Sequence, residues 1–136
     1  MTSTEIVGVM ALLPELNATG IGLGSHAERL APEERFALLR ERRSELLASS
    51  EQCLAACRWL VAAETTHFSN RPRSSRLLKY IMDYETGCYV SNGALIAAAV
   101  HRGFFWKPIA RGPSAWLWKS QTFLGQTLRA GREWPS

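Results

Sequence analysis

The stretch that decides the fold runs from Tyr89 to Phe104 and reads Y-V-S-N-G-A-L-I-A-A-A-V-H-R-G-F. Ser91 or Asn92 has the side chain that caps a helix, and the run from 93 to 102 that follows is apolar almost all round. A helix without a polar face belongs in a protein core. Gly103 ends the run. We therefore predict a core helix over residues 93–102.

Three further helices are predicted upstream of the core helix. The first begins near Pro32, which is well tolerated at the first helical position, and it ends at Ala48-Ser49-Ser50. The second begins with Ser50 as its N-cap, so the two helices are expected to form an antiparallel hairpin. The third covers residues 76 to about 85 and ends at Gly87. Ser74 or Ser75 caps it, and its predicted apolar face holds Leu77, Leu78, Ile81, Met82 and Tyr84.

Two β-like runs follow the core helix, over residues 104–109 and 115–119. They are rich in aromatic residues, which favour strands, and Gly112-Pro113 between them is a turn signal. Pro108 makes the first strand an edge strand or shortens it. The predicted fold class is α+β and mainly helical, with about four helices and a C-terminal two-stranded β-hairpin. The order of these elements is winged-helix-like.

The length of 136 residues fits a single domain over 1–136. Residues 1–31 show no clean period, and their three alternating glycines match neither common phosphate-binding pattern, so we expect a flexible or loosely packed segment. Residues 121–136 are expected to form a weak helix or a tail.

The composition points to a cytoplasmic protein. The longest apolar run, 93–100, is far shorter than the roughly 20 residues of a membrane-spanning helix. The N-terminus has no basic residue before its short apolar stretch, which argues against a secretory signal. The cysteines, Cys53, Cys57 and Cys88, are odd in number, which argues against a closed disulfide framework. We interpret them as reduced, buried thiols.

Chemistry-bearing patterns are weak. Cys53 and Cys57 lie in an apolar helix stripe, so we predict no metal site, and no cofactor motif is present. The chain has no G-x-S-x-G, and Ser74 and Ser75 do not stand in S-x-x-K spacing with Lys79. His101 is interpreted as the end of a helix, where its charge suits the dipole. We therefore predict a protein that is not an enzyme, with an enzyme of unknown type as the third alternative.

Charge is distributed unevenly along the chain. In residues 1–65, six arginines against nine glutamates give −3, whereas in residues 66–136 ten basic residues against three acidic ones give +7. Such asymmetry suggests a partner with phosphates or carboxylates, and the alternative is a basic solubilising surface. The candidate contact residues are Arg71, Arg73, Arg76, Lys79, Trp106, Lys107, Arg111, Trp116, Trp118 and Lys119. Tryptophans can stack on bases, but for each of the three we favour a place in the core, where it would cover the predicted core helix.

Two stretches resemble a motif of small uncharacterised accessory proteins of plasmids, prophages and integrative elements. They are Arg73-Ser74-Ser75-x-x-Leu78-Lys79 and the stretch 89–104, and the resemblance covers about residues 50–118. The chain departs from the pattern at residues 112–115, which read Gly-Pro-Ser-Ala where a small residue followed by Asn is expected. The resemblance implies a mobile-element context.

The predicted function is a non-enzymatic binding module that contacts DNA or RNA mainly through phosphates. Because the predicted core helix has almost nothing to bond base edges, the contact falls to residues 71–79 and the hairpin turn at Arg111. The alternative partner is a host defence protein complex that the chain inhibits by docking, in the manner of an anti-CRISPR protein.

Overall fold

The computed structural model describes residues 1–66 and 71–119. The described part is mixed α+β, with five α-helices, one 3-10 helix and two small antiparallel sheets. Its elements are α1 (Ser3–Leu12), β1 (Leu16–Asn17), β2 (Gly20–Ile21), η1 (Ser25–Arg29), α2 (Pro32–Leu47), α3 (Ser50–Thr66), β3 (Arg73–Ser74), α4 (Ser75–Thr86), α5 (Asn92–His101), β4 (Phe105–Pro108) and β5 (Ala115–Trp118). The predicted weak helix or tail at 121–136 lies outside the described residues.

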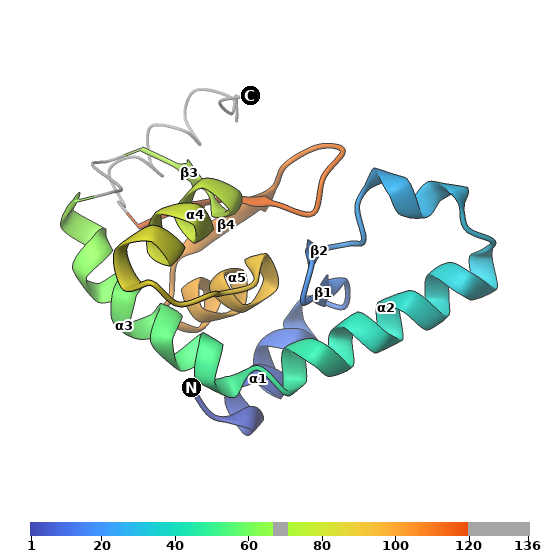
Figure 1. The fold of residues 1–136 in the computed structure, drawn as a ribbon, viewed down its shortest axis with the longest axis horizontal. Helices are drawn as coiled ribbons and strands as arrows, with labels where there is room; N and C mark the ends of the chain where they lie inside the picture. Colours follow the sequence, from blue (N-terminus) through green and yellow to red (C-terminus); the bar gives the residue numbers. More distant parts are fainter. Residues whose placement is uncertain (67–70, 120–136) are drawn as a thin grey trace.

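Helix α5 is the centre of the core, as its composition predicts. It packs against α1, α3, α4 and strands β1, β2, β4 and β5 (Figure 1). Every residue from 93 to 99 is buried, because glycine and alanine side chains let neighbours approach from all sides. Leu95 and Ile96 are fully buried, and each contributes about 1.5–3 kcal/mol of hydrophobic stabilisation.

The helix boundaries agree with the sequence predictions to within a few residues. Helix α2 has Pro32 in its first turn. Ser50, which we predicted to be the N-cap of α3, is instead the first residue of that helix. Ser74 caps α4 by accepting a hydrogen bond from the Leu77 amide, and Gly87 ends it at a φ of 70°. Ser91 caps α5 in the same way through the Ala94 amide. The local cap chemistry therefore sets these ends.

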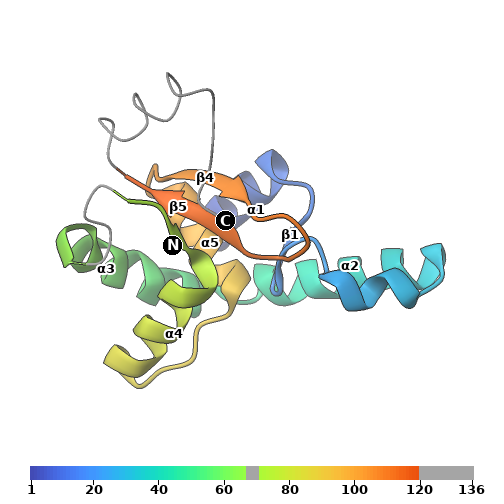
Figure 2. The same cartoon turned by 90° about the horizontal axis from the view of Figure 1, so that it is seen from above.

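The sheet is larger than predicted. Its order is β3-β5-β4, so the expected two-stranded hairpin gains a third strand. Strand β3 pairs Arg73 with Leu117 and Ser74 with Trp116, and the Ser75 hydroxyl accepts a hydrogen bond from the Ala115 amide at 3.0 Å. A two-residue strand has no period to detect, which is why the sequence missed it. Strand β4 is an edge strand, as Pro108 indicates, and Figure 2 shows the sheet lying over α5.

The prediction of a loosely packed segment over residues 1–31 is wrong. Helix α1 opens with a capping box between Thr2 and Glu5, and it buries Ile6, Val9 and Met10. These side chains join one hydrophobic cluster with residues of α3, α4 and α5. These residues complete the core around α5. Their spacing along the sequence is irregular, so no periodic pattern indicated that they are buried.

A close junction joins the N-terminal β1–β2 hairpin to α5. The buried Asn17 donates through Nδ2 to the carbonyls of Glu15 (2.9 Å) and Gly22 (2.8 Å), which closes the hairpin turn. The Asn17 carbonyl sits so close to Gly93 that a Cβ on Gly93 would overlap it. Gly20, at a φ of 139°, makes the same kind of close approach to the Pro113 carbonyl. Glycine is required at both positions for the three segments to meet.

We expect Gly93→Ala to destabilise the fold by about 1–3 kcal/mol, because the added methyl group overlaps the Asn17 carbonyl. The matched control is Gly8→Ala in α1, where an added Cβ meets no atom within 4 Å. Removing a helical glycine there should stabilise the protein by about 0.5–1 kcal/mol. Urea denaturation measures both, and equal effects of the two substitutions would contradict the close junction.

Candidate partner-binding surface

The N-terminal end of α5 is covered by the chain itself. The Gly93 amide donates to the Ala18 carbonyl at 3.1 Å, and Asn92 Nδ2 donates to the Thr19 carbonyl at 2.9 Å. The remaining face of α5 is buried by α1, α3 and α4. A partner therefore cannot reach residues 93–99 of this helix while the β1–β2 hairpin is docked.

Basic residues gather where β3 enters α4. Arg71 and Arg76 are exposed, whereas Arg73 lies in β3 and is half-buried. The hydrogen bond between Ser75 and Ala115 ties the first turn of α4 to the start of β5. Arg76 therefore stands at the end of the sheet where the β4–β5 turn begins.

The β4–β5 turn presents one further arginine. Arg111 is exposed and has a φ of 65°, which is uncommon for a residue with a side chain. The turn is held from below, because the Pro113 carbonyl accepts from the Ile21 amide at 2.7 Å and from Asn92 Nδ2 at 3.3 Å. The N-terminal hairpin thus fixes the position of the turn that carries Arg111.

Two predicted contact lysines are engaged within the protein. Lys79 Nζ lies 2.8 Å from an Asp83 carboxylate oxygen, and between the rings of Tyr80 and Tyr89 at 4.9 and 4.5 Å from their centroids. Lys119 Nζ donates to the Arg102 carbonyl at 2.9 Å. A partner would have to break these contacts, so both lysines are weaker candidates than the exposed arginines.

The three candidate tryptophans are all at least half-buried. Trp118 is only 3% exposed and stacks on Phe105, with 5.8 Å between ring centroids. Trp106 packs against the core cluster. Trp116 is half-buried and lies in one row of the sheet between Ser74 and the half-buried Lys107. The proposed stacking role therefore has no support at Trp118. Trp116 is partly exposed and does not belong to the core cluster.

The exposed aromatic side chains of α4 and of the loop that follows it are tyrosines. Tyr80, Tyr84 and Tyr89 are exposed, with Tyr84 at 90%, and Leu77 lies beside them on α4. The prediction that Leu77 and Tyr84 face the core is wrong, because α4 buries only the opposite stripe with Leu78 and Met82. The spacing of residues 77, 80 and 84 (i, i+3, i+7) could have revealed this second stripe. We call Leu77, Tyr80, Tyr84 and Tyr89 the tyrosine surface.

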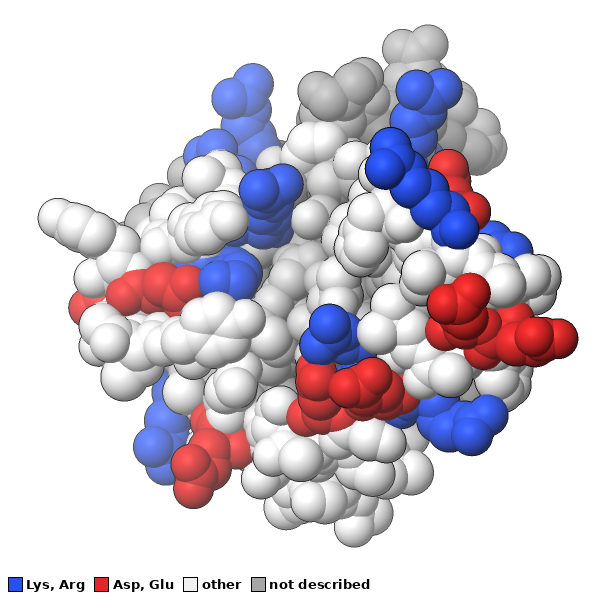
Figure 3. Space-filling view, turned by 45° about the vertical axis from the view of Figure 1, so that its right-hand side comes forward, with Lys and Arg blue, Asp and Glu red and all other residues white. Residues whose placement is uncertain are grey.

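The basic side chains do not form one continuous patch on the face drawn in Figure 3. Lys and Arg side chains are scattered there among Asp and Glu side chains, and several border a hollow near the centre of the view. On this face, a polyanion would meet separate basic side chains and not a continuous basic surface.

The cysteines differ in their surroundings. Cys53 is buried, and its burial raises the pKa of its thiol to about 12. Burial also raises the pKa of the half-buried Cys57. Cys88 is exposed, which corrects the prediction of three buried thiols. Among residues 1–66 and 71–119, no three His, Cys, Asp or Glu side chains are grouped as metal ligands.

His101 Nε2, at the C-terminal end of α5, lies 3.2 Å from a Glu5 carboxylate oxygen. This contact joins the ends of α1 and α5.

Within the described residues, no helix is long and apolar enough to cross a membrane.

Comparisons with protein-family models, with curated proteins and with solved structures found no match to this chain.

We expect the three thiols to react in the order Cys88, Cys57, Cys53 with a chromogenic disulfide reagent near pH 8. Thiolate is the reactive form, and a pKa of about 12 leaves Cys53 almost entirely protonated at that pH. Cys88→Ser should remove the fast phase, and denaturant should make the other two react together. A fast phase that persists in Cys88→Ser would contradict the arrangement.

Proposed function

We propose that the chain is a non-enzymatic binding module with a winged-helix-like order. The order α3, β3, α4, α5, β4, β5 with the sheet order β3-β5-β4 supports this reading. In that arrangement α4 and α5 are the two helices of a helix-turn-helix, and the β4–β5 turn is the wing. The fold alone does not identify a partner, whereas the exposed side chains indicate which chemical groups the protein can bind.

The partner we propose is nucleic acid, bound through its phosphates. Arg71, Arg76 and Arg111 are exposed and lie just before β3, in the first turn of α4 and in the hairpin turn. The exposed arginines at the start of α4 and on the wing are the observation that carries the proposal, because guanidinium groups bind phosphate bidentately. Base edges would not be read by α5, since the chain's own hairpin covers its N-terminal end. Binding should then depend little on base sequence.

A second candidate is docking on a host defence protein complex. The tyrosine surface favours it, because exposed tyrosines combined with arginine are typical of interface hot spots. Arg76 and Lys79 lie over the Tyr80 ring, at 5.9 and 4.9 Å from its centroid. The proposed mobile-element context is common to both candidates.

A salt titration of nucleic-acid binding tests the first candidate. For duplex DNA, the affinity should fall linearly on a log–log plot against salt, by about 0.9 per phosphate contact. Replacing Arg71, Arg76 and Arg111 by Ala should weaken binding and lower that slope by about 2.7. The matched control replaces three other exposed arginines, Arg29, Arg35 and Arg58, and removes the same net charge. Equal losses in the two triple variants, or no binding of duplex, single strand or RNA at low salt, would reject the proposed surface.

The second candidate is tested by capture from a host lysate treated with nuclease. Tyr80→Ala with Tyr84→Ala should abolish a captured complex if the tyrosine surface docks on protein, because both rings are exposed and their removal leaves the core intact. The Arg71, Arg76 and Arg111 variant serves as the comparison. A complex that disappears on nuclease treatment would argue for nucleic acid instead.

A further inference from the structure

Helix α2 extends from the body of the protein as an arm. Figures 1 and 2 both show its N-terminal half projecting away from α5 and the sheet. Leu46 is the buried residue of α2. Arg43 anchors the C-terminal half by donating to the carbonyls of Met10, Leu13, Pro14 and Leu16. The first two turns of α2 have no such anchor among the described residues.

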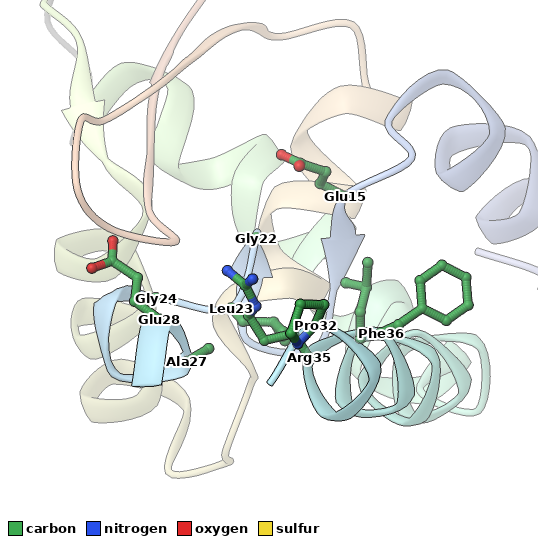
Figure 4. Close-up of a pocket in the computed structure, with 10 residues that line it drawn as sticks. Glu15, Gly22, Leu23, Gly24, Ala27, Glu28, Pro32, Arg35 and Phe36 are labelled. Carbon is green, nitrogen blue, oxygen red and sulfur yellow. The ribbon is translucent and has the colours of Figure 1, made fainter. Parts of the chain in front are cut away.

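The arm has a large apolar side chain on its surface, which is unfavourable in water unless a partner covers it. Phe36 is 66% exposed. It borders a cleft of about 390 Å³ between η1 and α2, which is also lined by Leu23, Ala27, Pro32 and Leu39. Figure 4 shows its ring on the side of α2 that points away from Arg35 and Pro32. A helix of this length is marginal in water without tertiary packing, so a partner on this side would stabilise it.

The exposed stripe around Phe36 is self-complementary. Glu33, Phe36 and Arg40 lie at i, i+3 and i+7, on one side of the helix. The Arg40 guanidinium already lies over the Phe36 ring, 5.3 Å from its centroid. Acid, aromatic ring and base therefore follow one another along the stripe, and no ion pair among the described residues uses either charge.

A two-fold axis through Phe36 would bring opposite charges together. At 1.5 Å of rise per residue, Glu33 lies about 4.5 Å before Phe36 and Arg40 about 6 Å after it. In an antiparallel pair, Glu33 of one copy would then fall within about 1.5 Å, along the helix axis, of Arg40 of the other. The same contact occurs twice, as closed two-fold interfaces require.

We propose that the arm binds a second copy of this chain through antiparallel pairing of the two α2 helices. Phe36 stacks on its counterpart at the two-fold axis, and two Glu33–Arg40 pairs flank it. The in-chain contact between Arg40 and Phe36 holds the guanidinium in place before the partner arrives, which lowers the entropic cost of pairing. A single helix pair is a small interface, so dimerisation is weak and depends on concentration.

The test is a charge swap followed by sedimentation equilibrium over a wide range of concentrations. Glu33→Arg and Arg40→Glu each place like charges opposite one another, so each variant alone should dimerise about tenfold more weakly or not at all. An equimolar mixture should form a heterodimer, because the two basic side chains of the first variant then face the two acidic side chains of the second. The double variant should regain the wild-type dimer. Restoration of this kind requires pairing between copies and does not follow from a structural role within one chain.

Phe36→Ala should abolish dimerisation, and circular dichroism should show an unchanged fold because the ring lies outside the core. Glu41→Arg with Arg35→Glu is the matched control, since the two residues have the same kinds of charge but lie outside the stripe. A wild-type chain that stays monomeric at the highest concentration would overturn the proposal. So would a dimer that survives Phe36→Ala, or a mixture no more associated than its parts.

Discussion

The contact between the Asn17 carbonyl and the backbone of α5 at Gly93 is the constraint on which the rest of the structure depends. It leaves no room for a side chain on Gly93, and it places the β1–β2 hairpin on the N-terminal turn of the core helix. From that position, the Ile21 amide reaches the Pro113 carbonyl and holds the β4–β5 turn. One close approach of backbone to backbone therefore joins the two ends of the described chain around α5.

This constraint decides which surface a partner can meet. Helix α5, which would be the recognition helix in the proposed arrangement, is enclosed, because its residues are apolar and because residues 16–21 cover its N-terminal end. Charged and aromatic side chains remain at the periphery, as arginines at the start of α4 and in the β4–β5 turn, and as tyrosines along α4. A partner that binds there contacts edges and turns, and such contacts favour phosphate or protein recognition over base readout.

The arm and the body have separate energetic roles. The body is stabilised by burial around α5, whereas the arm is tied to the body in its C-terminal half, where Arg43 donates to four carbonyls. The proposed pairing of two arms would carry two copies of the proposed binding module on one two-fold axis. Two linked modules raise the effective concentration of the second contact, so weak phosphate contacts could gain in avidity without new residues.

The sequence by itself determined the local features of this protein. Cap and stop residues such as Ser74, Ser91 and Gly87 set the helix ends, and the all-round apolar character of residues 93–100 determined that α5 is buried. These are interactions within a few residues or direct results of composition, so they can be read without knowing the fold. Tertiary structure alone decided what depends on distant partners. Strand β3 exists because β5 lies beside it, and Trp118 is buried while Tyr84 is exposed. The β1–β2 hairpin packs on α5 because Gly93 and Gly20 leave room for its backbone. Pairing, burial and close approach are properties of two segments at once, and a linear pattern in either segment cannot specify them.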